Sequence, residues 1–336
     1  MKACVYVSNA DSGDIHVLHM DAHSGALTPL QQVAVGGQLM PMAPSPDRRR
    51  LYVARRSAPL AVASLAIDAA SGELRLLGEA PLPDSMACIA TDRSGRWLFS
   101  ASYGGDCIAV SAIDAEGVAQ AAHQMLATPP HAHAIQADPS NRFVLATSLG
   151  GGVVLQLRFD AEQGLLTPNA LPHWQARPGA GPRHFVFHPN ARWVYLLNEL
   201  DAGVDLLDFD AERGTLQLRQ TVSALPPGFS GEPWAADLHL TPDGRFLYAS
   251  ERRSSTLAAF AVDAATGALA PIGSVPTESQ PRGFAIDPSG RFLCAAGQAS
   301  HRLSRYAIDS STGALTRLDG CAVGRNPNWV EVVPLG

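Results

Sequence analysis

Cysteine is scarce in this sequence, and no apolar run is long enough to cross a membrane. Crossing as a helix needs about 20 consecutive apolar residues, and the first seven residues also lack the apolar core of a signal peptide. The five cysteines are scattered, without the paired spacing typical of metal sites: Cys4, Cys88, Cys107, Cys294 and Cys321. We therefore expect reduced thiols in a cytoplasmic protein.

Excess positive charge and helical periodicity are absent too. The 25 lysines and arginines are outnumbered by 31 acidic residues, which gives a net charge of −6. A nucleic-acid-binding surface needs a basic patch, so we expect no nucleic-acid partner and no membrane partner. No long segment places apolar residues at the 3.6-residue period of a helix. The 30 glycines and 25 prolines are instead typical of short strands joined by tight turns.

Two turn motifs repeat along the chain. The first reads Pro-Asp-Gly-Arg-x-Leu-Tyr at residues 242–248, and its arginine recurs every 46 to 53 residues, at Arg49, Arg96, Arg142, Arg192, Arg245 and Arg291. The second reads Asp-Ala-x-x-Gly-x-Leu in its best copies and begins at Asp21, Asp68, Asp114, Asp160, Asp210, Asp263 and Asp309. Each unit accommodates four short strands, at 236–240, 246–250, 256–262 and 269–275 in the clearest one. This pattern predicts an all-β, seven-bladed β-propeller with four antiparallel strands per blade, in one domain of residues 1–336.

The unequal copy numbers predict how the ring closes. The first motif occurs six times and the second seven times, and stepping back 46 residues from Arg49 reaches Ala3. The strand of residues 3–7 therefore lacks its preceding turn, and its missing neighbour is the strand of residues 328–333. We expect one blade in which the C-terminal strand pairs with the N-terminal strands, because such closure removes exposed sheet edges.

The repeated turns and the variable loops are expected at opposite faces. Both motifs connect strands that end at the same face of an antiparallel sheet, whereas the other connections do not repeat and carry unusual polar residues. That separation is typical of a working face on a rigid scaffold. The residues expected to converge at the channel mouth are His131, His133, Arg183, His184, Asn198, Glu199, Trp234, Asp237, Arg282 and Trp329. Arginines and histidines around a carboxylate indicate a site for a small anionic, oxygen-rich molecule.

Several of these segments resemble signatures of the lactonase propeller family. They are Gly-Pro-Arg-His-Phe-Val-Phe-His-Pro-Asn at 181–190, Asn-Glu-Leu at 198–200, Trp-Ala-Ala-Asp-Leu-His at 234–239, Thr-Glu-Ser-Gln-Pro-Arg-Gly-Phe at 277–284 and Ala-Gly-Gln at 296–298. The resemblance runs from Val5 to Trp329 in one register. It implies a hydrolase that opens a sugar lactone, with 6-phosphoglucono-1,5-lactone of the pentose phosphate pathway as the expected substrate. It also implies an active-site set of His133, Arg183, Glu199 and Arg282, without metal or other cofactor.

Lactone opening needs a base for the attacking water and positive charge for the developing oxyanion. Glu199 is the expected base, and Arg183 and Arg282 are expected to bind the anion, because a guanidinium matches phosphate and carboxylate geometry. His133 is expected to polarise the carbonyl or to protonate the leaving alkoxide, although His131 fits the same role. Further residues expected to bind substrate are His131, His184, Asn198, Trp234, Asp237, Arg252, Arg56, Gln298, His301 and Trp329, whereas His239 is expected in the core.

The sequence leaves other functions open. A bare Gly-Gly-Gly loop at 150–152 favours a non-phosphorylated aldono- or aldarolactone as substrate, and a lactone-forming cycloisomerase is a remoter member of the same group. A non-catalytic binding scaffold is a third alternative, since fold alone does not decide function. Asn198, Glu199 and Asp237 offer oxygen ligands for a divalent ion, but the nearby arginines oppose a cation, so we expect no metal. We expect a monomer or weak homodimer.

Overall fold

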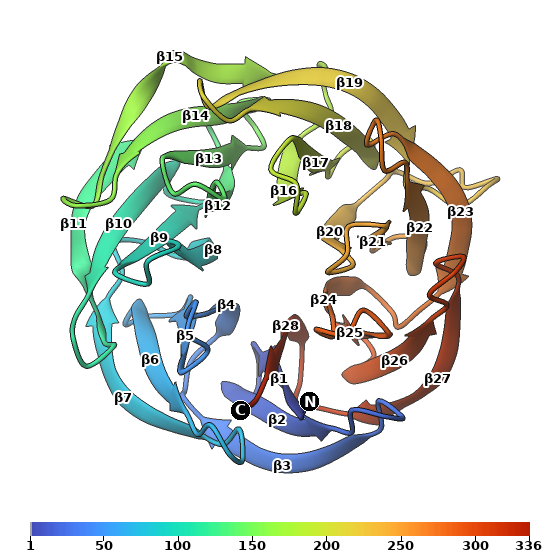
Figure 1. Ribbon diagram of the computed structural model, residues 1–336. Helices are drawn as coiled ribbons and strands as arrows, with labels where there is room; N and C mark the ends of the chain where they lie inside the picture. The colour runs from blue at the N-terminus through green and yellow to red at the C-terminus, as the bar shows by residue number, and fades with distance from the viewer. Residues whose placement is uncertain (1) are drawn as a thin grey trace.

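The computed structural model describes residues 2–336, which form a ring of seven four-stranded antiparallel sheets (Figure 1). From the centre outward, the first four sheets are β28 (Pro327–Pro334), β1 (Ala3–Asn9), β2 (Asp14–Met20) and β3 (Leu27–Ala34); β4 (Leu39–Pro44), β5 (Arg50–Arg55), β6 (Ala61–Ile67) and β7 (Leu74–Pro81); β8 (Met86–Thr91), β9 (Trp97–Ser102), β10 (Cys107–Ile113) and β11 (Ala119–Ala127); and β12 (Ala132–Ala137), β13 (Phe143–Ser148), β14 (Val153–Asp160) and β15 (Leu165–Gln175). The other three are β16 (Pro182–Phe187), β17 (Trp193–Asn198), β18 (Gly203–Asp210) and β19 (Thr215–Ser223); β20 (Ala235–Leu240), β21 (Phe246–Glu251), β22 (Thr256–Val262) and β23 (Leu269–Pro276); and β24 (Pro281–Ile286), β25 (Phe292–Gly297), β26 (Arg302–Ile308) and β27 (Leu315–Ala322). The predicted seven-bladed propeller is confirmed.

The predicted closure is confirmed as well. β1 pairs antiparallel with β28 on one side, where Val5 lies opposite Val332, and with β2 on the other, where Val5 lies opposite Leu18. The innermost strand of this blade is therefore supplied by the C-terminus. The two chain ends lie together on the face of the repeated turns (Figure 1).

The second repeated motif builds tight turns that pack on the neighbouring blade. In one copy, Oδ1 of Asp263 accepts the backbone N–H groups of Ala265 and Thr266. Gly267 follows with a φ of +75°, and a Cβ there would lie 2.5 Å from the ring of Trp193 in the preceding blade. Glycine is thus required both by the backbone and by this close approach.

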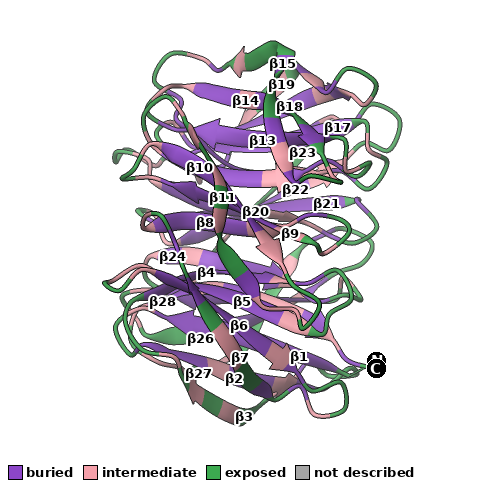
Figure 2. Ribbon diagram, turned by 90° about the vertical axis from the view of Figure 1, so that its left-hand side faces the viewer, coloured by how far each residue is buried: buried purple, intermediate pink, exposed green. Residues whose placement is uncertain are grey.

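The core lies between adjacent blades rather than in one central cluster. The inner strands are buried and the outermost strands are largely exposed (Figure 2), as β17 and β19 illustrate. Buried tyrosines also join blades: the hydroxyls of Tyr195 and Tyr248 donate to the carbonyls of Gly267 and Gly313, each at 2.8 Å. These bonds satisfy polar groups that burial would otherwise leave unpaired.

A cavity of about 550 Å³ occupies the channel on the side of the repeated turns. Its inner end is formed by residues of the innermost strands, among them His184, Asp237, His239, Trp329 and Glu331. No helix within residues 2–336 is long and apolar enough to cross a membrane.

Candidate active site

The seven innermost strands bring two layers of side chains to the channel. The second residues of these strands, nearest the mouth, are Met40, Ala87, His133, Arg183, Ala236, Arg282 and Asn328. The third residues are Pro41, Cys88, Ala134, His184, Asp237, Gly283 and Trp329. Each innermost strand shifts register against its neighbour near these positions. A bulge interrupts the alternation of side chains between the two faces of a strand. The consecutive residues Arg183 and His184 therefore both lie at the channel.

Glu199, directly after β17, lies between two guanidinium groups. Its Oε2 is 2.6 Å from Nε of Arg183 and 2.9 Å from Nη2 of Arg252. Burial alone would raise the pKa of the Glu199 carboxyl, but the positive charges of the two arginines outweigh burial and lower the pKa. The oxygen that would take a proton is thereby engaged by two charged groups. Its contacts favour orientation of the arginines over the predicted role as base.

Arg282 on β24 extends this pair into a cluster of positive charge. The charges that act on it come from Arg183, Arg252 and Arg56, against the single carboxylate of Glu199. Burial and then repulsion by these arginines lower the pKa of Arg282 well below its usual range. A half-buried positive charge with too little negative charge nearby costs free energy unless an anion binds. The cluster therefore has the electrostatics of an anion site.

His133 and His184 lie on the neighbouring strands β12 and β16, with ring centroids 5.0 Å apart. Three buried nitrogens here have no hydrogen-bond partner within residues 2–336: Nδ1 of His133, Nε2 of His184 and Nη1 of Arg183. Buried polar atoms are normally satisfied, so this group indicates where a water or ligand oxygen binds. Burial, followed by the charge of Arg183, lowers the pKa of both imidazoles, to about 4 for His184.

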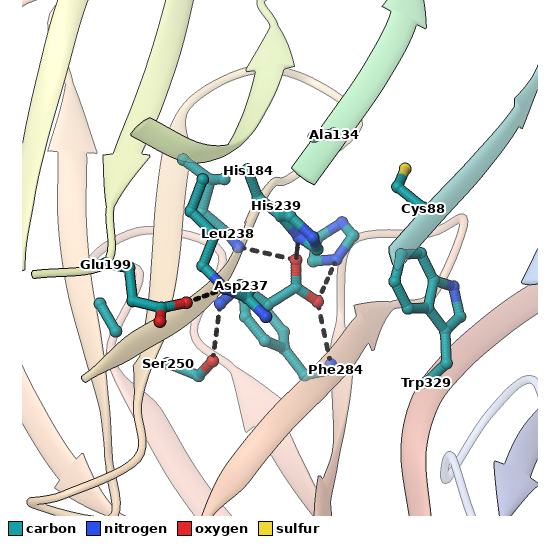
Figure 3. Close-up of polar contacts among 12 residues, drawn as sticks. Cys88, Ala134, His184, Glu199, Asp237, Leu238, His239, Ser250, Phe284 and Trp329 are labelled. Atoms are coloured by element: carbon teal, nitrogen blue, oxygen red, sulfur yellow. Dashed lines mark hydrogen bonds and ion pairs between the residues drawn. The ribbon is translucent and has the colours of Figure 1, made fainter. Parts of the chain in front are cut away.

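Asp237 on β20 is the hydrogen-bonding centre of the layer below the arginines (Figure 3). Its Oδ1 accepts from Nδ1 of His184 at 2.7 Å and from the backbone N–H of Leu238 at 3.0 Å. Its Oδ2 accepts from Nε2 of His239 at 3.1 Å and from the backbone N–H of Phe284 at 3.3 Å. Burial opposes ionisation, but the two histidines outweigh it and lower the pKa of Asp237. Because an ionised carboxylate only accepts, the proton of His184 sits on Nδ1 and Nε2 is left unprotonated.

The structure distinguishes the two candidate histidines and adds an aromatic residue. His133 is buried in the channel, whereas the His131 side chain is 43% exposed and stacks on Tyr103 with centroids 4.2 Å apart. Tyr103, in the loop between β9 and β10, also meets the edge of His133 at 6.0 Å. The prediction omitted Tyr103, although an aromatic residue in a non-repeating loop of the working face was a usable signal.

Further contacts hold two arginines of the charge cluster in place. The guanidinium of Arg252 lies 3.9 Å from the ring centroid of Trp234, and its Nε donates to the Trp234 carbonyl at 3.0 Å. Arg56 donates from Nε to Ser85 at 2.9 Å. Glu251, also omitted from the prediction, is buried and accepts from the backbone N–H of Trp234 at 2.6 Å.

Several predicted residues lie apart from the cluster. Asn198 is buried and donates to Asp205 at 2.8 Å, and Gln298 and His301 hydrogen-bond to Asn326 in the loop before β28. These contacts hold the three side chains to the scaffold, while Oδ1 of Asn198 has no partner within residues 2–336. Trp329 lines the channel cavity and donates from Nε1 to Glu331 at 2.8 Å. The expectation that His239 lies in the core was wrong: it lines the same cavity, and its side chain is 37% exposed.

The described residues gather no metal-binding set. Within residues 2–336, no three His, Cys, Asp or Glu side chains are arranged to hold a metal ion. The three oxygen donors considered from the sequence have separate partners: Glu199 contacts arginines, Asp237 contacts histidines and Asn198 contacts Asp205.

The chain is similar to known proteins of one family. The model of a family described as lactonase, 7-bladed beta-propeller, matches residues 4–332. A 6-phosphogluconolactonase of Yersinia pestis (strain Pestoides F) is 44% identical over 332 residues, covering 99% of this chain and 98% of that protein. One of Pectobacterium carotovorum subsp. carotovorum (strain PC1) is 44% identical over 335 residues, covering 100% of both. Among solved structures, a periplasmic gluconolactonase of Pseudomonas aeruginosa has a TM-score of 0.93 at 28% identity, covering 99% of each chain.

Proposed function

The chain belongs to the lactonase family of seven-bladed β-propellers, and from this premise we propose that it hydrolyses the ester of a sugar lactone, with 6-phosphoglucono-1,5-lactone as its substrate. Similarity to proteins named 6-phosphogluconolactonase over the full length of the chain supports this reaction. The product is 6-phosphogluconate, so the enzyme acts as a carboxylic ester hydrolase of the pentose phosphate pathway.

One observation carries the choice of substrate: Arg282 at the mouth is repelled by Arg183, Arg252 and Arg56, and the carboxylate that chiefly opposes them is Glu199. Glu199 is itself already engaged by Arg183 and Arg252. A phosphate dianion supplies the missing negative charge, and guanidinium groups bind phosphate oxygens with good geometry. The channel cavity on the other face contains none of these arginines, so we place the substrate at the mouth.

The same groups suit the reaction. Water attack on the lactone carbonyl develops negative charge on the carbonyl oxygen, and donors fixed beforehand stabilise it. Arg183 is held by Glu199 and has Nη1 free of any partner within residues 2–336. It is therefore a preorganised donor for the oxyanion, while Arg282 and Arg56 are left for the phosphate. His133, whose Nδ1 is also free, contacts the lactone beside them.

A non-phosphorylated lactone is the second candidate substrate. The observation in its favour is the close structural likeness to a protein named gluconolactonase. The bare loop at 150–152 no longer supports it, because a Cβ on Gly150 would lie 2.6 Å from the ring of His131. The glycine at position 150 is therefore explained by its close packing on His131 rather than by the choice of substrate.

We place the activity in the cytoplasm of a monomeric or weakly dimeric enzyme. The support is that all five cysteines are free, as is typical of proteins in reducing compartments. Cell fractionation and sedimentation of the purified protein test this; a periplasmic protein or a stable oligomer would contradict it.

The direct test is hydrolysis of freshly prepared 6-phosphogluconolactone and gluconolactone, with spontaneous opening subtracted. We expect kcat/KM to favour the phosphorylated lactone at least tenfold. Substituting Arg282 by Met should raise the KM for the phosphorylated lactone by roughly ten- to a hundredfold, since a hydrogen bond to a charged group contributes about 1.5–3 kcal/mol. Substituting the exposed Arg253 by Met is the matched control. The proposal is contradicted if neither lactone is hydrolysed faster than it opens spontaneously. Hydrolysis of gluconolactone alone would instead support a non-phosphorylated lactone as the substrate.

A further inference from the structure

We propose that His184, oriented by Asp237, is the general base that activates the hydrolytic water, and that Glu199 serves to hold the arginines. The inference rests on the proposed lactone hydrolysis and identifies the group that takes the proton in that reaction. The sequence predicted the base at Glu199, beside the arginines. His184 lies one residue further along the innermost strands than the arginines.

The first support is the geometry of the dyad. Nδ1 of His184 donates to Oδ1 of Asp237 at 2.7 Å, and three further donors hold that carboxylate in place. The ring orientation and the tautomer of His184 are thus fixed, and its Nε2 is an acceptor without a partner within residues 2–336. A neutral histidine oriented by a carboxylate, with its second nitrogen free, is an arrangement suited to taking a proton from a hydroxyl or water.

The second support is the position of His184 between the two halves of the channel. Its ring lies 5.0 Å from that of His133, and it follows Arg183 directly in the chain. The same residue lines the cavity of about 550 Å³ on the opposite side. A cavity of that size holds many waters, each of which takes about 30 Å³ of liquid volume. We therefore place the substrate at the mouth and the source of the hydrolytic water in the cavity.

The charges around His184 suit a base that is neutral at rest. Asp237 on β20 favours its protonated form, whereas Arg183 on β16 and Arg282 on β24 oppose it, as does burial. His133 on β12 packs against it as a second neutral ring, and Trp329 on β28 adds an uncharged ring at 5.6 Å. Once Nε2 takes a proton, Asp237 stabilises the imidazolium.

The reaction balances with these groups alone. Nε2 takes a proton from water as the water oxygen bonds to the lactone carbonyl carbon, and Arg183 stabilises the oxyanion. The intermediate then collapses with cleavage of the bond between that carbon and the ring oxygen. The Nε2 proton passes to the leaving ring oxygen, which becomes a hydroxyl, and the new carboxylic acid releases its proton to solvent. His184 returns to its neutral form.

The test compares His184→Gln with Glu199→Gln in the full-length protein. Positioned general bases contribute about 10²–10⁴-fold, so His184→Gln should lose at least a hundredfold in kcat with a small change in KM. Its remaining rate should rise with hydroxide concentration between about pH 6 and pH 8, because hydroxide replaces the base. Glu199→Gln should keep a rate that is independent of pH in this range. Circular dichroism and thermal unfolding establish that each variant is folded.

His173→Gln is the matched control, since His173 is exposed on the outermost strand β15. It should leave kcat unchanged. The inference is overturned if wild type hydrolyses the lactone but folded His184→Gln keeps kcat within threefold, or if His173→Gln loses as much as His184→Gln. Absence of hydrolysis by wild type would instead refute the proposed function, so the two failures are distinguishable.

Discussion

Nδ1 of His184 and Oδ1 of Asp237 lie 2.7 Å apart and join the innermost strands of two adjacent blades, β16 and β20. The contact lies one residue further along these strands than the arginine layer. It links the charge cluster at the mouth to the cavity on the other face. The architecture of the ring, rather than a local motif, creates this contact, because the two residues are 53 positions apart in the chain.

Asp237→Asn should disrupt this pair measurably. The variant removes the negative charge that accepts from both His184 and His239, and deleting one member of a buried charged network costs about 3–5 kcal/mol. We expect a matching loss in the free energy of unfolding by denaturant titration. We expect the hydrogen-bonded Nδ1 proton of His184 to resonate downfield in proton NMR of the wild type and to shift upfield in the variant. An unchanged NMR signal would show that the pair does not form in solution.

Glu199→Gln should make the stability of the protein depend on anions. Without the carboxylate, Arg183 and Arg252 lose their shared partner and repel each other, which lowers the melting temperature. Inorganic phosphate should restore it, because a ligand that binds only the folded state stabilises it by mass action. Differential scanning calorimetry with phosphate and with chloride of equal ionic strength measures the effect. Equal shifts in both salts would argue against an anion site.

Arg282→Met should stabilise the protein while weakening its activity. Replacing a half-buried charge by an apolar side chain of similar length removes the cost of desolvating that charge, and here it also relieves repulsion by Arg183 and Arg252. We expect higher resistance to guanidinium together with the higher KM given above. A variant that is less stable than wild type would show that Arg282 is compensated.

Glu331→Gln should stabilise the protein at neutral and alkaline pH. Burial raises the pKa of Glu331 to about 7, so the folded state holds a proton that the unfolded state releases near pH 4.5. Stability from this group is present below the unfolded pKa and is lost as pH rises toward 7. The gain from Gln should therefore be larger at pH 8 than at pH 5, by about 2 kcal/mol. A gain that does not vary with pH would contradict the raised pKa.

Removal of residues 327–336 should abolish cooperative folding. These residues contain β28, which pairs with β1 and contacts the neighbouring innermost strands β4 and β24. Without them the closing blade loses its innermost strand, the channel loses Trp329, and β1 becomes an exposed edge. Limited proteolysis and thermal unfolding monitor the change. A truncated chain that melts cooperatively at the wild-type temperature would show that closure is dispensable.

The fold and its closure were predictable because the turns repeat and one copy is missing at the termini. The placement of Arg183, Glu199 and Arg282 at one mouth followed from their positions in non-repeating loops and strand starts. The paired arginines on Glu199 were not predictable, because Arg252 comes from another blade and the contact depends on side-chain geometry.

The role of the histidine layer was hidden for a different reason. Regular alternation places His184 and His239 on one face of their strands and their neighbours on the other. The register shifts in β16 and β20 break that alternation. Nothing in the local sequence marks these bulges, so the hydrogen bonds of Asp237 to both histidines emerge only in three dimensions.

A crystal structure with 6-phosphogluconate bound tests the assignment of the site most directly. We expect the phosphate on Arg282 and Arg56, a carboxylate oxygen within about 3 Å of Nη1 of Arg183, and the hydroxyl formed from the ring oxygen donating to Nε2 of His184 at a similar distance, the usual hydrogen-bond distance. Density for the product in the cavity on the turn face, or a product whose carboxylate is remote from Arg183 and whose new hydroxyl is remote from His184, would contradict this arrangement.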